Sequence, residues 1–508
     1  MSLRKVDVLL VGAGVMSATL GKLLSLLDPS LKIMMVERLS KVAHESSHGL
    51  NNAGTGHAGY CELNYTPQRP DGSVDISRAL SINAAYEVSL QFWSYLVEQG
   101  VLPAPEKFIN PIFHQSFVWG GQNVAFLRKR YQALHTHHLF EEMEYSEDHA
   151  VLRRWMPLVM EHRDPNQAVA ATQVRHGTDV DFGMLTRKLV RAMSMHPTFE
   201  LRLGHTITVL KQYPDGRWHV RVTDNQQNHS KTIDAGFVFL GAGGGALPLL
   251  QKSGIPEGQG YGGFPVSGHW LICRNPDVVK RHTSKVYGKA PGGAPPMSVP
   301  HLDARIIDGR PGLLFGPFAS ITTRFLKGGS VLDMFSSIKS DNLKPMLAVA
   351  RDNLELTRYL VTEAFRSHKD RVASLREFYA DAKPNDWELA SAGLRVQIIK
   401  DCDINGGRLE FGTEIVTARD GALASLLGAS PGASTSVQAM IEVIEHCFKS
   451  RVKSADWQRK LKAMIPSYGE SLDGNVALLH AVRERTLATL GLEHREGKAG
   501  SKMKLDSA

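Results

Sequence analysis

The sequence predicts an α/β protein with two parts: a Rossmann-like dinucleotide-binding domain, built on a doubly wound sheet with an antiparallel insertion, and an α+β substrate domain with a mixed β-sheet. Three observations predict this class. They are a strand, glycine-rich turn, helix and strand at the N-terminus, an alternating segment over residues 206–222, and a region over 264–335 rich in Gly, Pro and short apolar runs. The 508 residues are also too many for one simple core.

The N-terminal residues have the pattern of a βαβ unit. Val6 to Val11 is a compact, mostly aliphatic run that stops at Gly12, as expected of a buried parallel strand. Leucines then recur at helical spacing until Asp28-Pro29 ends the pattern, and Ile33 to Val36 supplies a second strand. A right-handed crossover joins the two strands and opens a doubly wound sheet.

Later segments alternate between the two kinds of sheet. Residues 206–222 alternate in period two around Pro214-Asp215-Gly216, which predicts a hairpin, and a buried strand at 237–240 returns to the parallel sheet. Helices are predicted over 341–380, strands at 394–399 and 409–411, and a last strong helix from near Ser434. The predicted nucleotide-binding domain is therefore discontinuous and comprises residues 1–85, 172–264 and 385–450. The predicted substrate domain comprises residues 86–171 and 265–384. C-terminal helices and a tail are predicted over residues 451–508.

The composition limits the possible partners. Lysine and arginine exceed aspartate and glutamate by 59 − 51 = 8, which suits an anionic substrate, anionic lipid or nucleic acid. Aromatic residues are only 7% and form no recognisable module, which argues against nucleic acid. The four cysteines lie far apart without a C-x-x-C pair, so no zinc site, redox dithiol or disulfide framework is expected and a reducing cytoplasm fits best. No export signal or transmembrane helix is predicted.

The glycine-rich turn is a variant of the dinucleotide fingerprint. In Gly12-Ala13-Gly14-Val15-Met16-Ser17, Gly12 permits the tight turn and Gly14 lets a pyrophosphate approach the helix N-terminus. Ser17 replaces the third glycine, where a small residue is needed for close packing of helix and strand. Glu37 ends the second strand, where a carboxylate can accept both ribose hydroxyls of an adenosine.

This motif alone does not separate NAD from FAD, but two further segments favour a tightly held flavin. The strand at 237–240 runs into Gly241-Ala242-Gly243-Gly244-Gly245, a second close approach of backbone to the cofactor. Residues 428–435 open the helix from Ser434, and their N–H groups could face the pyrimidine edge of a flavin. The nucleotide-binding domain is therefore predicted to hold FAD.

Several long segments are similar to the malate:quinone oxidoreductase family, over a stretch from near residue 5 to about residue 450. They are Val8 to Leu20 with Val36-Glu37-Arg38, Glu45 to His57, Glu62 to Gln68, Pro265 to Gly268, Val299 to Arg305, Leu314 to Ala319, and Phe325-Leu326-Lys327. The resemblance implies a flavoprotein with a fold of the D-amino-acid-oxidase and L-2-hydroxyglutarate-dehydrogenase type. It also implies NAD-independent oxidation of (S)-malate to oxaloacetate in the citric acid cycle, with a membrane quinone as acceptor and a peripheral position at the cytoplasmic face of the cell membrane.

The predicted cofactor-binding residues combine the fingerprint, the glycine-rich turns and the loop before His57. They are Gly12, Gly14, Ser17, Glu37, Arg38, Asn52, Gly54, Gly243, Pro431, Gly432, Ala433 and Ser434.

Malate oxidation needs a base for the C2 hydroxyl and cations for the carboxylates. Histidine is the usual base for an alcohol, and two candidates remain open: His57, after a glycine-rich turn, and His301, in the β-rich region. Arg305 would share a strand face with His301 because their spacing is even, and its planar fork makes it the first choice for a carboxylate. Lys327 is the second choice.

The substrate, the basic segment near the C-terminus and a cluster of histidines each allow an alternative interpretation. The same fold could serve another 2-hydroxy or amino acid, such as L-2-hydroxyglutarate or a D-amino acid. The basic segment from Phe448 to Met464 is read as a solvated surface helix, with contact to anionic lipid as its alternative. The histidines at 135, 137 and 138 lack an acid at metal-site spacing, so no metal is predicted.

Overall fold

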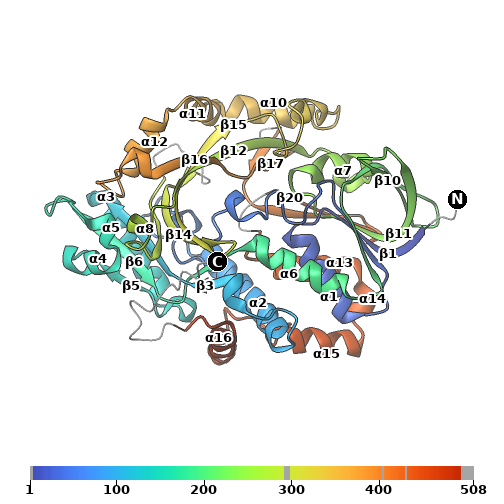
Figure 1. The fold of residues 1–508 in the computed structure, drawn as a ribbon, viewed down its shortest axis with the longest axis horizontal. Coiled ribbons are helices and arrows are strands. Elements are labelled where there is room, and N and C mark those ends of the chain that lie inside the picture. The colour runs from blue at the N-terminus through green and yellow to red at the C-terminus, as the bar shows by residue number, and fades with distance from the viewer. Residues whose placement is uncertain (1–3, 291–297, 403–405, 429–431, 494–508) are drawn as a thin grey trace.

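The computed structural model describes residues 4–290, 298–402, 406–428 and 432–493. It contains two large sheets, one in each half of the view in Figure 1, with helices around both. Because the strands of each sheet come from distant parts of the sequence, the chain passes several times between the two halves.

The first sheet is doubly wound, as predicted. Its order is β19 (Thr413–Thr417), β20 (Leu423–Gly428), β11 (Ser230–Leu240), β1 (Arg4–Val11), β2 (Ile33–Val36) and β8 (Phe199–Arg202). The pairs from β20 to β8 are parallel and β19 is antiparallel to β20. The predicted hairpin is present as β9 (His205–Gln212) and β10 (Trp218–Asp224), which adds antiparallel structure beside β11.

Both faces of this sheet are buried. Val8 and Leu10 of β1 pack in a core with α1 (Val15–Leu27), α6 (Phe182–Ser194) and α13 (Ser436–Cys447). Their neighbours Leu9 and Val11 pack in a second core with α7 (Ala246–Ser253) and the hairpin. Burial on two sides explains why these strands read as continuous apolar runs rather than as alternating ones.

The second sheet is mixed, as predicted. Its order is β18 (Arg408–Glu410), β17 (Arg395–Lys400), β12 (Gly262–Cys273), β15 (Arg310–Ile321), β14 (His301–Ile307), β13 (Ser284–Tyr287), β4 (Phe113–Trp119), β6 (Val169–Val174) and β5 (Glu144–Ser146). β16 (Trp387–Ser391) also pairs with β12, and a small ribbon joins β3 (Ile109–Pro111) to β7 (Thr178–Val180). Only β13 and β4 pair in parallel within the described part of this sheet.

The remaining helices surround the two sheets (Figure 1). They are α2 (Ser77–Glu98), α3 (Gly121–His135), α4 (His149–Trp155), α5 (Pro157–Met160), α8 (Pro276–Val279), α9 (Asp333–Ser336), α10 (Leu343–Asp352), α11 (Leu354–Ala364), α12 (His368–Leu375), α14 (Lys449–Val452), α15 (Ala455–Met464) and α16 (Val476–Leu490). The helical pattern at 341–380 is thus present as three helices.

Strand pairing differs from the predicted domain limits in one segment. Residues 385–450 were assigned to the nucleotide-binding domain, but β16, β17 and β18 pair with the second sheet. The chain returns to the first sheet only at β19. The local sequence of a strand does not determine which sheet it pairs with. The sequence therefore could not show that these three strands and β19 belong to different sheets.

α15 and α16 lie within the predicted C-terminal helices at 451–508, although the sequence showed no strong apolar pattern after the helix from near Ser434. α16 has 15 residues and packs against α2. Its buried positions include Arg483 and Thr486 beside Leu479 and Val482, so its buried face is only partly apolar. An apolar stripe at helical spacing therefore could not reveal it.

The basic segment near the C-terminus has no free apolar face. Val452, Trp457, Leu461 and Met464 are buried in the core that contains α1 and α13. Its lysines and arginines lie outside this core, which agrees with a surface helix and removes the apolar side that a lipid contact would need. Within the described ranges, no helix has the length and apolarity required to cross a bilayer.

Candidate active site

A cavity of about 460 Å³ is lined by elements of both sheets. One stretch of its wall is the βαβ turn with Glu37 and Arg38, together with residues 241–245. Another stretch includes the loop from Asn51 to His57, and Arg395 of β17. The nucleotide-binding turn, the loop from Asn51 to His57 and Arg395 of the second sheet therefore line the same cavity.

The turn at Gly12 requires glycine for two reasons. Its φ is +94°, in the left-handed region, and a Cβ there would lie 2.6 Å from the carbonyl oxygen of Gly241. At Gly14 a Cβ would lie 3.3 Å from Ser47 Oγ, which accepts a hydrogen bond of 2.9 Å from the N–H of Val15 at the start of α1. Backbone and small hydroxyl groups therefore form this part of the cavity wall.

Ser17 does not line the described cavity, although it was predicted to be part of the cofactor site. It is fully buried between α1 and the first sheet. A Cβ on Gly241 would collide with Ser17 Oγ, so the glycine at 241 makes room for the serine that replaces the third glycine of the fingerprint. Ser17 thus serves helix–strand packing, which is the physical role of that position.

Glu37 and Arg38 lie at the end of β2 and line the cavity. The two carboxylate oxygens of Glu37 accept hydrogen bonds from the N–H groups of Ala13 (2.7 Å) and Leu39 (2.8 Å), which fixes the carboxylate against the turn. Nη2 of Arg38 is buried and finds no hydrogen-bond partner in the part of the chain that the structure describes. A buried donor without a partner is costly, and an anionic or polar ligand in this cavity would satisfy it.

The loop before His57 is held by its own asparagines. Asn52 Oδ1 accepts from the N–H of Gly54 (3.0 Å), and Asn52 Nδ2 donates to the carbonyl oxygen of His48 (2.9 Å). Asn52, Gly54 and Gly243 all line the cavity, as do Gly432, Ala433 and Ser434 just before α13. Pro431 lies outside the described residues.

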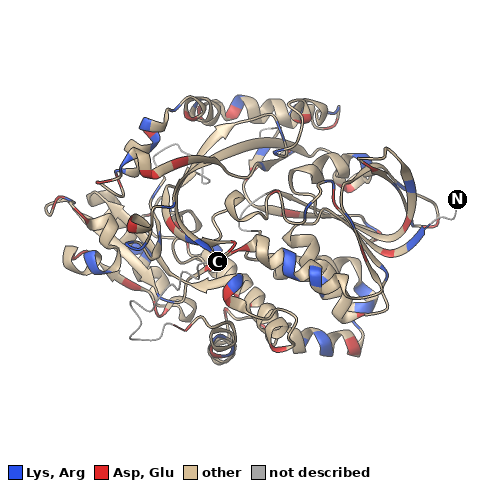
Figure 2. Cartoon of the chain, viewed as in Figure 1, with Lys and Arg blue, Asp and Glu red and all other residues tan. Residues whose placement is uncertain are grey.

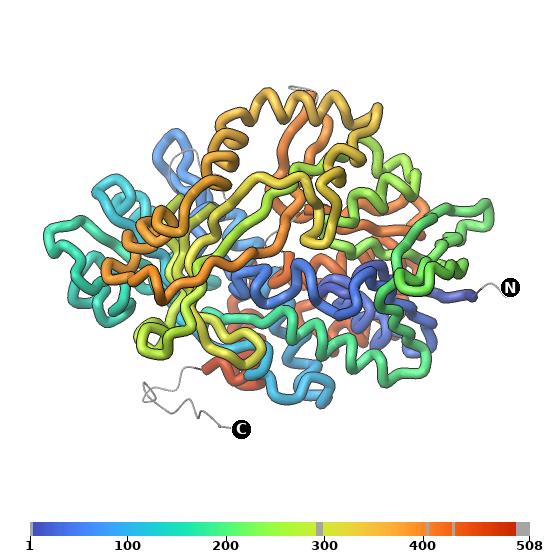
Figure 3. The backbone as a smooth tube through the Cα atoms, turned by 45° about the horizontal axis from the view of Figure 1, so that its top comes forward, coloured from blue at the N-terminus to red at the C-terminus, as the bar shows by residue number. Residues whose placement is uncertain are grey.

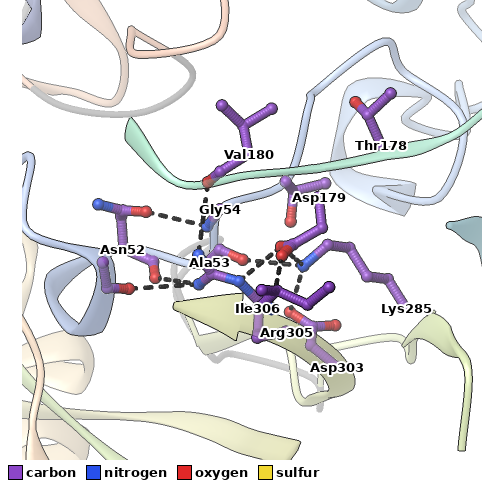
Figure 4. A network of polar contacts seen from close by, with 12 residues as sticks. Asn52, Ala53, Gly54, Thr178, Asp179, Val180, Lys285, Asp303, Arg305 and Ile306 are labelled. Atoms are coloured by element: carbon purple, nitrogen blue, oxygen red, sulfur yellow. Dashed lines mark hydrogen bonds and ion pairs between the residues drawn. The ribbon is translucent and has the colours of Figure 1, made fainter. Parts of the chain in front are cut away.

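Arg305 is enclosed by protein groups rather than facing the cavity (Figure 4). Its Nε lies 2.5 Å from Asp179 Oδ1, and its Nη1 donates to the carbonyl oxygen of Asn52 (2.8 Å). A Cβ on Gly54 would collide with the guanidinium. The planar fork proposed for a malate carboxylate is therefore engaged in holding the loop that carries His57.

Arg305 belongs to a buried ionic network of four charged side chains, two acidic and two basic (Figure 4). Lys285 Nζ lies 3.0 Å from Asp179 and 3.6 Å from Asp303, and it donates to the carbonyl oxygen of Ala53 (2.9 Å). All four side chains are almost fully buried. Burial alone would raise the pKa of Asp303, but the neighbouring His301, Lys285 and Arg305 lower it to about 2.

Removing one charge from this network is expected to destabilise the fold. Asp179→Asn keeps the shape but leaves two buried cations facing one carboxylate, which costs about 3–5 kcal/mol in comparable buried pairs. Thermal unfolding should show a clear fall in midpoint, whereas Asp277→Asn, whose carboxylate is exposed and pairs with the exposed Lys280, should unfold like the wild type. An unchanged midpoint for Asp179→Asn would mean that the network adds no stability.

The two candidate bases occupy different positions. His57 lines the cavity, whereas His301 is 5% exposed, does not line it, and stacks on Tyr287 at 4.1 Å between ring centroids. His301 Nδ1 lies 2.8 Å from Asp303 Oδ2. Burial, followed by the nearby His114, His301, Lys285 and Arg395, lowers the pKa of His57 to about 3. His57 is therefore neutral at neutral pH and able to accept a proton.

Lys327 does not line the described cavity and is engaged with protein groups. Its Nζ donates to Asn51 Oδ1 (2.5 Å) and to the carbonyl oxygen of Ser391 (2.9 Å). Burial lowers the pKa of Lys327, while Glu45 opposes this shift. Its contacts join the loop around Asn51 to β16.

Arg395 is the cation that sequence reasoning missed. It lines the cavity at the start of β17, and its side chain makes no hydrogen bond or ion pair with any residue in the described ranges. Burial lowers the pKa of Arg395, and the neighbouring Tyr287, Tyr65 and Glu62 oppose this shift. A lone arginine between Leu394 and Val396 in the strand predicted at 394–399 was the signal that could have identified it.

Comparisons with known proteins assign the family. A model described as malate:quinone oxidoreductase (Mqo) matches residues 4–492. The chain belongs to this family. A probable malate:quinone oxidoreductase of Hahella chejuensis is 64% identical over 495 residues, which are 97% of this chain and 100% of that protein. One of Methylobacillus flagellatus is 63% identical over 486 residues, which are 96% of this chain and 98% of that protein.

Family membership makes this chain an oxidoreductase for malate and a quinone, which confirms the resemblance inferred from the sequence. Solved structures at low identity confirm the predicted fold class. L-α-glycerophosphate oxidase from Mycoplasma pneumoniae, solved with FAD bound, has a TM-score of 0.57 at 14% identity and covers 88% of this chain and 95% of its own. Glycine oxidase from Bacillus cereus has a TM-score of 0.51 at 12% identity, with coverages of 88% and 95%.

Proposed function

We propose that this malate:quinone oxidoreductase family member uses FAD to oxidise (S)-malate to oxaloacetate in the citric acid cycle and passes the electrons to a membrane quinone. One observation carries this proposal: His57 and Arg395 line the same cavity as the nucleotide-binding turn at Gly12 and Gly14. A proton acceptor and an unpaired cation are the two groups that a 2-hydroxy acid requires beside a two-electron acceptor.

The residues that line the cavity suit FAD. Gly12 and Gly14 would admit the pyrophosphate at the start of α1, Glu37 would accept the ribose hydroxyls, and the buried Nη2 of Arg38 would gain a partner. Gly432 to Ser434 would present backbone to the flavin ring before α13. When bound, FAD supplies the acceptor for the electron pair of the C2–H bond of malate.

The residues of the chain then bind malate and accept a proton. Arg395 would hold one carboxylate, because it lines the cavity and its guanidinium has no hydrogen-bond or ion-pair partner among the described residues. Binding this anion offsets the positive charge that helps to lower the pKa of His57. His57 would then take the proton of the C2 hydroxyl as the bond from C2 to oxygen becomes a carbonyl.

His301 is proposed as a positioning residue rather than the base. Its stacking on Tyr287 and its contact with Asp303 place it behind the cavity wall. Tyr287 Oη in turn lies 2.7 Å from Thr55 Oγ1, and Thr55 lines the cavity two residues before His57. This chain of contacts links His301 to the loop that orients His57.

The proposal is tested by anaerobic reduction of the purified holoenzyme. Malate should bleach the flavin absorption without NAD, and a quinone analogue should restore the colour faster than oxygen does. L-2-Hydroxyglutarate and D-amino acids should bleach it more slowly, which separates malate from the other substrates that this fold serves. Bleaching by NADH but not by malate would overturn the proposal.

The cofactor site gives a prediction of its own. Glu37→Ala removes the carboxylate for the ribose, and Gly14→Val places a branched side chain where a Cβ already lies 3.3 Å from Ser47 Oγ. Both variants should lose most of their flavin, measured as the ratio of flavin to protein absorbance. Gly474→Val is the matched control, because a Cβ there meets nothing within 4 Å. Full flavin in both variants would place the adenosine site elsewhere.

A further inference from the structure

Exposed apolar side chains gather on one surface of the molecule. Ten of the fifteen large apolar side chains that are exposed among the described residues lie between residues 321 and 365. They are Ile321, Val331, Leu332, Phe335, Ile338, Leu343, Leu347, Leu354, Val361 and Phe365, and we call this surface the α9–α11 patch. Figures 1 and 3 show that α10 and α11 form an outer edge of the molecule, beside the second sheet. Such clustering marks an interaction surface, since scattered apolar residues would not concentrate in one segment.

The helices of the patch already bury their inner faces. Ala348 and Val349 of α10 are buried, and α10 packs on β17 and β18. Leu360 of α11 is buried, and α11 packs on β15. Leu347 is 62% exposed and Phe365 is 85% exposed on the other side. The outer apolar face is therefore additional to what folding requires.

The patch is connected directly to the wall of the cavity. Phe325, Leu326 and Asp333 line the cavity, and Val331, Leu332 and Phe335 of the same segment are exposed. Asp333 Oδ2 accepts hydrogen bonds from the N–H groups of Phe325 and Ser330, each 3.1 Å long, which fixes the start of α9 to the cavity wall. A molecule held at the patch lies next to the segment that encloses the proposed cofactor site.

Charged residues around the patch are more often basic than acidic. The exposed basic residues are Arg324, Lys339, Lys344, Arg351, Arg358 and Lys369, against the exposed acidic residues Asp341, Asp352, Glu355 and Asp370. The pair of Asp352 and Arg351 cancels one charge of each sign, which leaves five basic against three acidic residues, and Asp370 of these three caps α12 through Ser367. Figure 2 shows lysine and arginine along these helices. Apolar side chains flanked by lysine and arginine are typical of surfaces that enter the headgroup region of an anionic bilayer.

We infer that the α9–α11 patch docks on the surface of an anionic lipid bilayer and brings the cavity next to the pool of membrane quinone. The inference rests on the proposed function, because a lipid-soluble acceptor is the reason for docking there. The basic segment at α15 is not an equivalent candidate, since its apolar side chains are buried in the core.

Vesicle sedimentation of the purified holoenzyme tests the apolar contact. The wild type should sediment with vesicles of phosphatidylcholine and phosphatidylglycerol, and less with phosphatidylcholine alone. The triple variant Phe335→Ser, Leu347→Ser, Phe365→Ser should reduce the partition coefficient by at least about tenfold, because bilayer affinity scales with the apolar area buried. The matched control replaces three exposed apolar residues elsewhere: Met195→Ser, Tyr213→Ser and Val476→Ser. It should sediment like the wild type.

Charge reversal provides a second, independent variant. Lys344→Glu with Arg358→Glu should weaken sedimentation severalfold and remove its dependence on phosphatidylglycerol, as expected when cations near the surface each add to the attraction. Lys453→Glu with Lys462→Glu, on the C-terminal helices, should bind vesicles like the wild type. Equal losses in both pairs would show only a nonspecific charge effect and would overturn the assignment to the patch.

Activity measurements separate this inference from the proposed function. Patch variants should retain flavin content and malate oxidation with a water-soluble quinone analogue, but lose turnover with a long-chain quinone embedded in vesicles. Wild-type sedimentation by the triple patch variant would overturn the inference while leaving malate oxidation untouched. Failure of malate to bleach the flavin in an enzyme that binds vesicles through the patch would overturn the proposed function and leave the docking surface in place.

Discussion

Replacing His57 with asparagine is expected to slow flavin reduction at saturating malate by about 10²–10⁴-fold, the usual contribution of a positioned proton acceptor. Asparagine keeps a polar side chain of similar reach but cannot take the hydroxyl proton. Stopped-flow bleaching under anaerobic conditions measures the step directly. His229→Asn, at an exposed position outside the cavity, is the control and should reduce at the wild-type rate.

His301→Asn distinguishes a positioning role from that of the base. It removes the ring that stacks on Tyr287 and contacts Asp303, so a loss of about tenfold or less is expected, from altered orientation of the loop before His57. A wild-type rate in His57→Asn together with a large loss in His301→Asn would reverse the two assignments. Wild-type rates in both would exclude each histidine as the base.

The pH dependence follows from the pKa of His57. In the free protein this pKa is lowered to about 3, so the imidazole is already neutral throughout the physiological range. A plot of kcat/KM, which reports ionisations of the free enzyme, should therefore show no rise through about pH 6.5, the ordinary pKa of histidine. The free energy of unfolding depends on pH in the opposite direction to that expected for a histidine paired with an acid. Because the unfolded state binds the proton of His57 more tightly than the folded state does, the stability of the fold decreases as the pH falls below the ordinary pKa of histidine.

The sequence was informative where local pattern and chemistry coincide. The strands at residues 6–11 and 33–36, the turn at Gly12 and the hairpin at 206–222 all follow from short-range signals, because periodicity and glycine placement report local conformation. Glu37 could be placed beside the turn for the same reason, since the end of one parallel strand lies next to the end of its neighbour. The fold class followed from these elements.

The candidate site was harder to predict from the sequence, because the residues that form it are distant from one another along the chain. Whether Arg305 faces substrate or protein depends on Asp179, which lies on β7 in another part of the chain. The even spacing of His301 and Arg305 predicted a shared face of β14, but neither residue lines the cavity: Arg305 contacts the loop at 49–54, and His301 contacts Tyr287 and Asp303. Strand periodicity shows which residues share a face, but it does not show whether that face contacts protein or a ligand.

The sheet to which a strand belongs also depends on contacts between residues that are distant in sequence. β17 was predicted as a strand, yet its pairing with β12 is what brings Arg395 to the cavity. Val266 of β12 lies opposite Arg395 in this register. An arginine in an apolar strand is costly to bury unless it has a partner, so its presence indicates either a structural ion pair or a ligand. Only the folded structure shows that the side chain of Arg395 has no ion-pair partner among the residues that it describes.

Arg395→Met should therefore raise the KM for malate by about 10²–10³-fold, equivalent to about 3–4 kcal/mol, because a malate carboxylate would enter the cavity without its cation. Arg395→Lys keeps the charge but loses the bidentate fork, and an intermediate loss is expected. Steady-state kinetics with a soluble quinone analogue measures both, and Arg310→Met, at an exposed arginine, is the control. Arg305→Met should instead lower the unfolding midpoint, since it breaks the buried network. If Arg395→Met bound malate normally and Arg305→Met raised KM at unchanged stability, the carboxylate would belong to Arg305 and the proposed orientation of malate in the cavity would be wrong.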